Sequence, residues 1–398
     1  MAIVSVQDVK VAGKRVLVRV DFNVPLDEKK GVITDDSRIR AALPTIQYLI
    51  DEGAKVILCS HLGRPGGKVI EKLRLDIVAE RLSQILGRQV VVTTDSIGPD
   101  VEKAIEKLRN GGVLLLENIR FHPEEEENDA SFARALARLA DIYVDNAFGA
   151  VHRAHASIVG ITRHLPAVAG LLLEKELEAL GNILENPAHP FGGLLGGAKI
   201  IDKVAMLENI MDKVDYLLIG GGMAATFLKA QSYETGLSLI EADMLSTAVG
   251  LMEKAARNSA RLLLPVDVVV ANEISAEAEV IKTVSIDNIP SNLRIVDIGP
   301  QTIRSFQEKL RQCKTVFWNG PMGIYEIPQF AEGTKNMARF LASLGAATII
   351  GGGSTAEVVN ELGLADKMTF VSTGGGASLR FLSGKTLPGV EALLKKEH

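Results

Sequence analysis

Four arginines occupy comparable places in the first half of the chain, each a few residues beyond a short apolar run. They are Arg38, Arg64, Arg120 and Arg153, and His61 comes three residues before Arg64. A guanidinium group presents a planar fork of donors that matches the oxygens of carboxylates and phosphates. Because like charges repel, four arginines brought together in the fold would favour an anionic ligand. The alternative is that they are scattered over the surface and bind nothing. The pattern predicts a site for a phosphorylated or carboxylated molecule.

Short apolar runs are expected to form the strands that position these side chains. Asp21 and Asn23 close the first run two residues apart, so they share one face of an extended chain. In an open α/β sheet the carboxyl ends of parallel strands converge on one crevice. We therefore expect the arginines, which follow different strands, to meet at this edge.

The second half of the chain carries four glycine clusters, each between an apolar run and a helical pattern. They lie at 196–197, 220–222, 351–353 and 374–376. Such turns direct backbone N–H groups and the positive end of a helix toward a phosphate. Four of them favour a nucleotide or polyphosphate site over tight packing alone.

Two common phosphate motifs are missing. The Gly384-Lys385-Thr386 sequence resembles the end of a Walker A loop, but Leu379 stands where the first glycine is required. No glycine cluster has the Gly-x-Gly-x-x-Gly spacing with a later acidic residue that dinucleotide-binding proteins use. These absences argue against a P-loop and against a dehydrogenase.

The second half of the chain also carries two lysines and a further turn that could contact a nucleotide. Lys199 and Lys203 are four residues apart, so we expect both on one face of the helix after the first cluster. Two lysines near a helix N-terminus oppose its dipole, which favours a bound anion; solvated surface lysines are the alternative. The turn from Trp318 to Gly323, with Glu326 beyond it, could cradle a base and bind ribose hydroxyls.

The wider sequence predicts an α/β fold. The chain has 398 residues, 47% hydrophobic and 23% charged, which indicates two domains. Apolar runs alternate with amphipathic patterns, as βαβ units require. Strands are expected at 15–20, 54–59, 89–92, 113–116 and 142–144, and from near 193, 216, 261, 293, 315, 346 and 368; helices are expected at 38–52, 74–86, 99–110, 129–140 and 171–184.

Charge and cysteine content narrow the class of protein. The net charge is −5, and the first 170 residues hold 23 basic and 23 acidic residues, with 14 arginines among the basic ones. This balance argues against a general nucleic-acid or membrane surface. Cys59 and Cys313 are far apart, so neither a disulfide framework nor a cysteine zinc site is expected. With no apolar run of 18 residues, we predict a cytoplasmic protein.

Several sequence motifs together resemble the phosphoglycerate kinase family. They are RVDFNVP, SHLGRP, LLENIRFHPEEE, HRAHAS, GGAK with DK, IGGGMAATFLKA, FWNGPMG and STGGGASL, spanning 19–379 in the order of the family. The resemblance implies reversible phosphoryl transfer from 1,3-bisphosphoglycerate to ADP with Mg²⁺, giving 3-phosphoglycerate and ATP. It also implies a monomer, and the net charge argues against nucleic-acid and membrane partners.

The resemblance further implies two Rossmann-like domains with parallel sheets, joined by an interdomain helix and a hinge. On this basis we predict an N-terminal acid-binding domain at 1–170 and the helix at 171–187. A nucleotide-binding domain follows at 188–376, and the segment 377–398 returns to the N-terminal domain.

Site residues are carried over where this sequence matches the family motifs. The acid-binding set comprises Asp21, Asn23, Arg38, His61, Arg64, Arg120 and Arg153. The nucleotide set comprises Lys199, Lys203, Asn319, Glu326, Gly351, Gly352, Gly353, Ser354 and Thr355, with Gly197, Gly221, Gly222 and Pro321 near the base.

Phosphoryl transfer depends mainly on positioning and on neutralising charge. We predict that Arg38 and Lys199 flank the transferring group and that the N–H groups of Gly374, Gly375 and Gly376 complete the cradle. No general base is needed, because the attacking oxygen is already ionised. The two sites belong to separate domains, so closure is needed to exclude water.

One position departs from the family. Ser354 follows the 351–353 glycines where most members have an aspartate that binds magnesium, and a hydroxyl is a weaker ligand for this cation. The metal ligands are therefore left open, with the nucleotide phosphates as the main candidates and helix capping as the alternative role of Ser354. Two other functions also stay open: an enzyme acting on a different phosphorylated acid, and a non-catalytic anion-binding protein.

Overall fold

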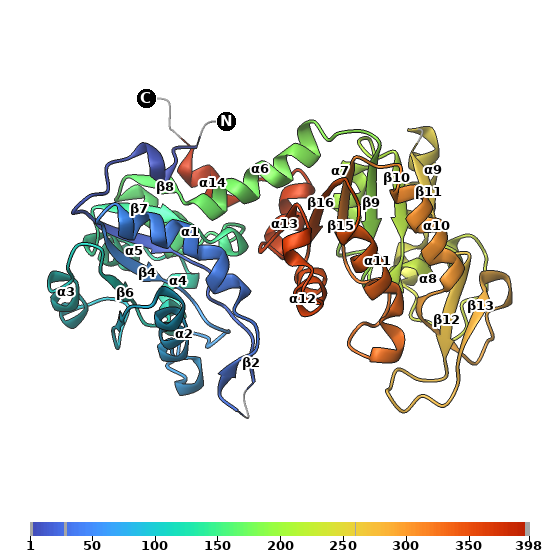
Figure 1. Ribbon diagram of the computed structural model, residues 1–398, viewed down its shortest axis with the longest axis horizontal. Coiled ribbons are helices and arrows are strands. Elements are labelled where there is room, and N and C mark those ends of the chain that lie inside the picture. The colour runs from blue at the N-terminus through green and yellow to red at the C-terminus, as the bar shows by residue number, and fades with distance from the viewer. Residues whose placement is uncertain (1–2, 28–29, 259, 395–398) are drawn as a thin grey trace. The chain divides into compact units, whose positions relative to one another are not determined.

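The computed structural model describes residues 3–27, 30–258 and 260–394 (Figure 1). The chain divides into two compact units. The N-terminal unit comprises Met1–Glu178 and Thr386–His398, and the C-terminal unit comprises Ala179–Lys385. The C-terminal unit thus extends beyond the predicted limit at residue 376, and residues 395–398 of the predicted terminal segment lie outside the described residues.

A six-stranded parallel sheet forms the centre of the N-terminal unit, in the order β5-β6-β4-β1-β7-β8. The strands are β1 (Arg15–Arg19), β4 (Lys55–Cys59), β5 (Val90–Val92), β6 (Val113–Leu115), β7 (Ile142–Asp145) and β8 (Ala167–Ala169). Helices lie on both sides of the sheet (Figure 1), so its strands are buried on both faces and read as continuous apolar runs. In β4, for example, the four residues from Val56 to Cys59 are all buried.

Helices connect these strands. They are α1 (Ser37–Asp51), α2 (Asp76–Leu86), α3 (Pro99–Glu106), α4 (Pro123–Glu126) and α5 (Ala130–Arg138), with the hairpin β2 (Leu26–Asp27) and β3 (Val32–Ile33) before α1. Local signals set their ends. The Asp129 side chain accepts the N–H of Phe132 at 2.8 Å to begin α5, and Gly87 ends α2 in the left-handed region at φ 63°.

The end of the chain belongs to the N-terminal unit. Helix α14 (Pro388–Leu393) packs on the π-helical turn Ala156–Gly160, and the N–H of Gly389 donates to the carbonyl of Val151 at 2.9 Å. Leu394 forms an antiparallel bridge with Ile3. The first and last described residues of the chain are therefore neighbours.

The C-terminal unit has a second six-stranded parallel sheet, in the order β11-β10-β9-β15-β16-β17. Its strands are β9 (Phe191–Leu195), β10 (Tyr216–Ile219), β11 (Arg261–Leu263), β15 (Thr315–Asn319), β16 (Ala347–Gly351) and β17 (Phe370–Val371). Its helices are α7 (Val204–Ile210), α8 (Gly221–Ala230), α9 (Leu245–Arg257), α10 (Pro300–Leu310), α11 (Glu332–Ala342), α12 (Gly353–Glu361) and α13 (Gly376–Leu382). The boundary between the units falls within α6 (Leu171–Glu185), which agrees with the helix expected at 171–184.

The sequence did not predict a three-stranded antiparallel sheet in this unit. Strands β12 (Asp267–Ala271), β13 (Ile281–Ser285) and β14 (Arg294–Ile298) form it in the order β13-β12-β14. Only β14 was expected. Four of the five residues of β13 are exposed, so it lacks the apolar run that marks the buried parallel strands. The α/β fold class with two parallel sheets is nevertheless confirmed.

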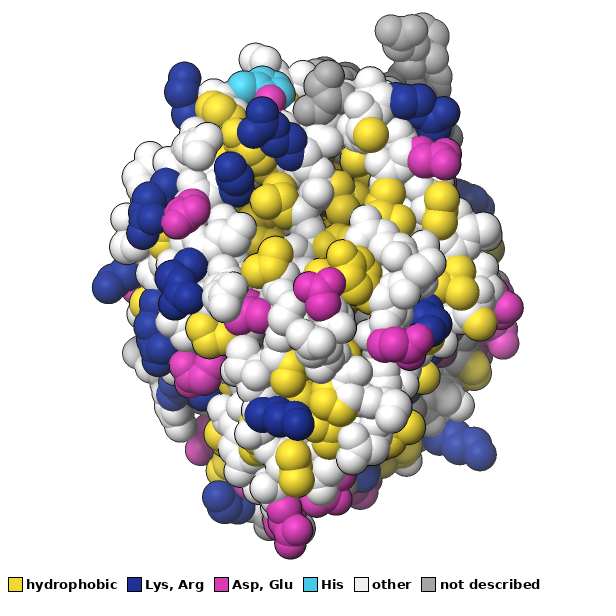
Figure 2. Space-filling view, turned by 90° about the vertical axis from the view of Figure 1, so that its right-hand side faces the viewer, with side chains coloured by type: hydrophobic (Ala, Val, Ile, Leu, Met, Phe, Trp, Pro, Cys, Tyr) yellow, Lys and Arg dark blue, Asp and Glu magenta, His cyan; other side chains and the backbone are white. Residues whose placement is uncertain are grey.

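Both cysteines are free and buried, as expected. Within 3–27, 30–258 and 260–394, no helix is long and apolar enough to cross a membrane. On the face seen in Figure 2, hydrophobic side chains occur in small groups among lysines, arginines and acidic residues. Such mixing is ordinary for a protein surface and indicates no special role for this face.

Candidate active site

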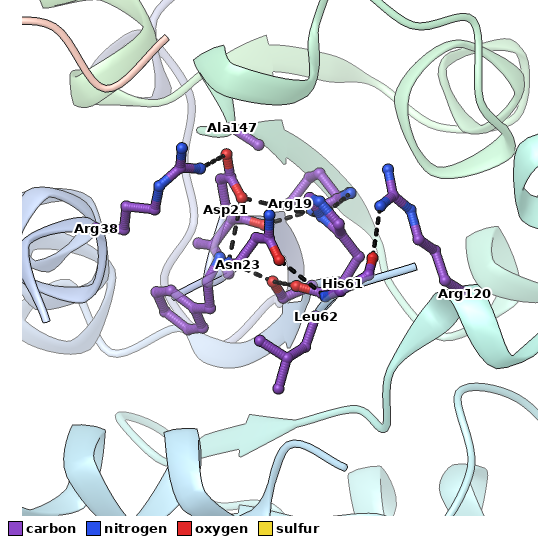
Figure 3. A network of polar contacts seen from close by, with 12 residues as sticks. Arg19, Asp21, Asn23, Arg38, His61, Leu62, Arg120 and Ala147 are labelled. Carbon is purple, nitrogen blue, oxygen red and sulfur yellow. Dashed lines mark hydrogen bonds and ion pairs between the residues drawn. The ribbon is translucent and has the colours of Figure 1, made fainter. Parts of the chain in front are cut away.

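The acid-binding residues follow neighbouring strands of the N-terminal sheet. Strands β6, β4, β1 and β7 are adjacent, and the predicted residues come after their carboxyl ends or, for Arg38, in the first turn of α1. Figure 3 shows Arg19, Asp21, Asn23, Arg38, His61 and Arg120 in one network of polar contacts. The structure therefore brings five predicted residues, Asp21, Asn23, Arg38, His61 and Arg120, together at one edge of the sheet, and it adds Arg19, which was not predicted.

Asp21 holds Arg38 within this network. The Arg38 guanidinium donates to Oδ2 of Asp21, and the N–H of Asn23 donates to Oδ1 at 3.3 Å. Burial raises the pKa of the Asp21 carboxyl, but Arg38, His61 and Arg19 together lower it below its ordinary value. Asp21 is thus ionised at neutral pH, and its carboxylate can hold the Arg38 guanidinium in place.

The loop after β4 is held from both sides. The N–H of Gly63 donates to Oδ1 of Asn23, and Arg120 donates to the carbonyl of Gly63, both at 2.8 Å. Gly63 has a φ of 65°, and a β-carbon there would come within 2.9 Å of the Leu73 side chain. This fixed loop carries His61, which is buried, and Arg64, which is exposed.

Positive charge is crowded in this part of the unit. Burial, Arg153 and Arg19 together lower the pKa of Arg120 to about 10. Burial also lowers the pKa of His61 well below its usual value. The positive charges of Arg19, Arg120 and Arg153 lower it further, whereas the negative charge of Asp21 raises it. Arg153 is half-buried, and its Nε donates to Nε2 of the adjacent His152 at 3.3 Å. Glu126 pairs with Arg120 at 3.3 Å and offsets part of this charge. The remaining positive charge favours an anionic ligand, as an acid-binding site requires.

Sequence reasoning missed two buried charges beneath this site. Arg19 is fully buried in β1; its Nε donates to Oγ of Ser157 at 2.8 Å, and its Nη2 lies 3.2 Å from Nδ1 of His61. Glu125 is also fully buried and accepts from the Ser157 backbone at 2.8 Å and hydroxyl at 2.7 Å. Arg19 ends β1, and the other end of this strand is also an arginine, so the sequence carried no signal that Arg19 is buried.

The glycine clusters lie at the carboxyl edge of the second parallel sheet. They follow β9, β10, β16 and β17, and the turn with Asn319 and Pro321 follows β15. A cavity of about 690 Å³, here called the lysine cavity, lies among these loops. The predicted residues that line it are Gly197, Lys199, Lys203, Asn319, Pro321, Gly352, Gly353, Ser354, Thr355, Gly375 and Gly376.

A second cavity of about 750 Å³, here called the leucine cavity, shares Gly197, Ala198, Pro321 and Ser354 with the first. Its other predicted lining residues are Gly221, Gly222 and Glu326. Apolar side chains that sequence reasoning missed, including Leu237, Leu239 and Ile240, complete its wall. A polar cavity beside an apolar one suits the phosphates and base of a nucleotide.

Two predicted glycines lie outside both cavity linings. A β-carbon on Gly351 would approach the Phe317 ring to 2.8 Å, so this glycine allows close packing of strands β15 and β16. The N–H of Gly374 donates to Oγ of Ser372 at 3.1 Å. The roles assigned to these two residues stay predictions.

The helical placement expected for Lys199 and Lys203 is wrong. Helix α7 begins only at Val204, so Lys203 is its N-cap residue and Lys199 lies in the loop before it. Four-residue spacing places two side chains on one face only where the backbone is already helical. The two lysines nevertheless line the same cavity.

Lys203 is buried and paired with an amide. Its Nζ donates to Oδ1 of Asn319, and burial lowers its pKa to about 8, with Asp202 opposing this shift. Nδ2 of Asn319 is also buried and has no hydrogen-bond partner among the described residues. A buried lysine without a carboxylate contact and an unused amide donor both favour an anionic ligand in this cavity.

The described residues contain no group of three or more His, Cys, Asp or Glu side chains that could hold a metal ion. Ser354 lines both cavities, and Asp202 lines the lysine cavity. Magnesium commonly keeps several water ligands and binds through substrate phosphates with one or two protein groups. The residues present fit a cation that is carried by the nucleotide.

A cluster of arginines on one α/β unit and a pair of cavities lined by lysines and glycine turns on the other are features that a phosphotransferase requires. The sequence profile of the phosphoglycerate kinase family matches residues 6–385. The chain belongs to this family, whose members transfer a phosphoryl group in glycolysis with a carboxyl group as acceptor.

Named relatives and solved structures agree. The chain is 54% identical over 396 residues to phosphoglycerate kinase of Moorella thermoacetica, which covers 100% of both chains. It is 57% identical over 385 residues to that of Synechococcus elongatus, covering 96% of this chain and 95% of the relative. The structure of phosphoglycerate kinase from Coxiella burnetii has a TM-score of 0.86 at 42% identity, covering 98% of this chain and 99% of that one. The Pyrococcus horikoshii structure has a TM-score of 0.87 at 31% identity, covering 98% of each.

Proposed function

We propose that the N-terminal unit binds 3-phosphoglycerate or 1,3-bisphosphoglycerate through Asp21, Asn23, Arg38, His61, Arg64, Arg120 and Arg153. The observation that carries this assignment is the gathering of Arg19, Arg38, His61 and Arg120 at one edge of the sheet. Burial and the neighbouring cations lower the pKa of Arg120, although Glu126 lies 3.3 Å from its Nε. A phosphate or carboxylate would neutralise this charge. Asp21 and Asn23 serve the site by holding Arg38 and the Gly63 loop.

The nucleotide binds in the C-terminal unit, with its base in the leucine cavity and its phosphates in the lysine cavity. Lys203 and the unused amide donor of Asn319 meet phosphate oxygens, while Glu326 accepts from ribose hydroxyls. N–H groups at the start of α12 and α13 add further donors, since helix N-termini favour anions. In ADP and ATP, the base suits the apolar leucine cavity and the charged phosphates suit the lysine cavity.

Arg38 and Lys199 stabilise the phosphoryl group during transfer. Because the attacking oxygen is ionised, these residues neutralise charge and do not move a proton. Magnesium enters with ADP or ATP as part of the substrate and neutralises phosphate charge when bound. The acid and the nucleotide occupy different units, so the two must approach for transfer; small-angle scattering with both ligands should show compaction.

We also propose a cytoplasmic location and a monomeric state, which family membership supports. The phosphorylated acid is 3-phosphoglycerate, and a panel of related phosphorylated acids would distinguish this from another acceptor. A non-catalytic binding protein would bind both ligands without turnover.

A coupled assay of ATP consumption with 3-phosphoglycerate tests the assignment. Arg38→Ala and Lys199→Ala should each lower the rate at least about 10²-fold, the usual effect of losing a transition-state donor. Arg40→Ala is a matched control on α1, because Arg40 pairs with Asp36 at 2.8 Å, and Lys229→Ala is a control on α8. Equal losses in the variants and their controls would overturn the assignment.

A further inference from the structure

The loop that carries Lys199 is fixed at both ends by different parts of the C-terminal unit. At its start, the N–H of Gly197 donates to the carbonyl of Pro321 at 2.8 Å, and the carbonyl of Gly197 accepts from Met223 at 3.0 Å. At its end, Lys203 and Val204 donate to the carbonyl of Ile200 at 2.8 and 2.9 Å. Lys199 lies between these two fixed points.

Glu241 supplies the contacts that hold the far side of this loop. Its Oε2 accepts the N–H of Ile200 at 2.5 Å, and its Oε1 accepts the N–H of Ile201 at 3.3 Å. Ile200 is buried, but Ile201 is 55% exposed, so packing alone does not fix this turn. A carboxylate acceptor makes stronger bonds to backbone N–H groups than a neutral one does.

Glu241 is itself held firmly. Its N–H donates to Oγ1 of Thr226, which is buried in α8, at 3.2 Å. Its carbonyl accepts from Met244 at 2.9 Å, which closes the 3₁₀ turn Ala242–Met244. The carboxylate therefore projects from an anchored backbone toward the lysine loop.

The residues just before Glu241 form part of the leucine cavity. Leu237, Ser238, Leu239 and Ile240 line it, and the Ser238 hydroxyl accepts the N–H of Ile295 at 2.9 Å. One short segment thus contacts the proposed base site and then holds the loop of the proposed phosphate site. Within the described chain, no ion pair or hydrogen bond holds the Lys199 side chain, so its location depends on the backbone.

We propose that Glu241 is a positioning residue that sets the place of Lys199 relative to the nucleotide phosphates by binding the backbone of Ile200 and Ile201. This inference rests on the proposed role of Lys199 in phosphoryl transfer. Glu241 does not touch the nucleotide in this account. Its removal should therefore impair turnover more than nucleotide binding.

The test compares Glu241→Ala and Glu241→Gln with Asp243→Asn, a control at an exposed carboxylate in the same 3₁₀ turn. We expect Glu241→Ala to lower kcat about 10- to 100-fold, as small misplacement of a reacting group does. The KM for ADP should change less than about threefold. Glu241→Gln keeps one amide oxygen as an acceptor, so its kcat should lie between those of wild type and Glu241→Ala. If Glu241→Ala does not fold, Glu241→Gln provides the test instead.

Two further measurements separate positioning from general stability. The Ile200 amide should exchange its hydrogen faster in Glu241→Ala, while the thermal midpoint stays near that of Asp243→Asn. In the double variant with Lys199→Ala, the loss of kcat should not exceed that of Lys199→Ala alone, because both changes act through one group.

An unchanged kcat in Glu241→Ala, or additive losses in the double variant, would overturn the inference while leaving the role of Lys199 intact. An unchanged kcat in Lys199→Ala would overturn both the proposed lysine role and this inference.

Discussion

Nη2 of Arg19 lies 3.2 Å from Nδ1 of His61. A guanidinium can only donate, so Nδ1 must accept and the ring proton must reside on Nε2. Burial, together with Arg19 and its neighbouring arginines, lowers the pKa of His61 well below its usual value despite the opposing effect of Asp21. His61 therefore contributes a neutral N–H donor to the acid site rather than a positive charge.

We predict that His61 stays neutral, with its proton on Nε2, throughout pH 5 to 8. Nitrogen-15 NMR of labelled histidine would show this tautomer directly, with exposed His164 as an internal reference. A doubly protonated His61 ring at pH 6 would contradict the prediction and the hydrogen-bond direction assigned to Arg19.

Nucleotide binding should weaken above about pH 8. Burial lowers the pKa of Lys203 to about 8, so the free protein loses this charge as pH rises through that value. Because the charged lysine binds phosphate, Kd for ADP should rise up to about tenfold per pH unit above 8. Calorimetric titrations from pH 7 to 9.5 would measure it. Arginine stays charged over this range, so Lys203→Arg should flatten the profile, and an equally steep profile would exclude Lys203 as its origin.

The stability of the C-terminal unit should fall between pH 4 and pH 8 because of Asp297. Burial raises its pKa to about 7, although the N–H groups of Ile298 and Gly333 donate to it at 2.8 and 2.7 Å. The folded state therefore keeps a proton that the unfolded chain releases near pH 4. This contribution is complete below pH 4 and is lost as pH rises through 7.

Asp297→Asn cannot ionise and should reduce this pH dependence. We expect the thermal midpoint of the variant to rise relative to that of the wild type as the pH increases from 5 to 8. Differential scanning calorimetry would measure both midpoints. A constant difference between the two proteins over this range would show that Asp297 does not titrate as proposed.

Ser354→Asp should change the magnesium requirement. Ser354 lies in the first turn of α12 and lines both cavities. A carboxylate there would add a hard oxygen ligand near the proposed phosphate site. We expect half-maximal activity at a lower free Mg²⁺ concentration, measured at fixed ADP, with Ser354→Asn as the neutral control. Identical magnesium curves for all three proteins would show that this position takes no part in metal binding.

The sequence predicted the buried parts of the fold better than the exposed ones. The strands of the two parallel sheets are apolar on both faces, so runs such as β4 stand out. Strand β13 is mostly exposed and carries no such signal. Glycines and arginines at strand ends predicted which residues the structure brings together at the carboxyl edges of the two parallel sheets, because a residue's place at a strand end can be read from local sequence.

Long-range contacts were not predictable from the sequence. The conformation of the Lys199 loop depends on Glu241, which is 41 residues from Ile200. The four-residue spacing of the lysines could not reveal this contact, and the helix predicted to carry both lysines is not formed. Arg19 reads as an ordinary strand residue until the fold places Ser157 and His61 beside it. Such roles follow from tertiary neighbours rather than from sequence pattern.

The bridge between Ile3 and Leu394 and the placement of α14 have a consequence for biosynthesis. The ribosome makes the residues up to Glu178 first, but the N-terminal unit lacks α14 until the whole stretch Ala179–Lys385 has been made. The C-terminal unit is one uninterrupted stretch, so all its strands are made before α14. Since domains generally fold as units, we expect the N-terminal unit to complete its native contacts only after the segment that carries α14 has followed the C-terminal unit out of the ribosome.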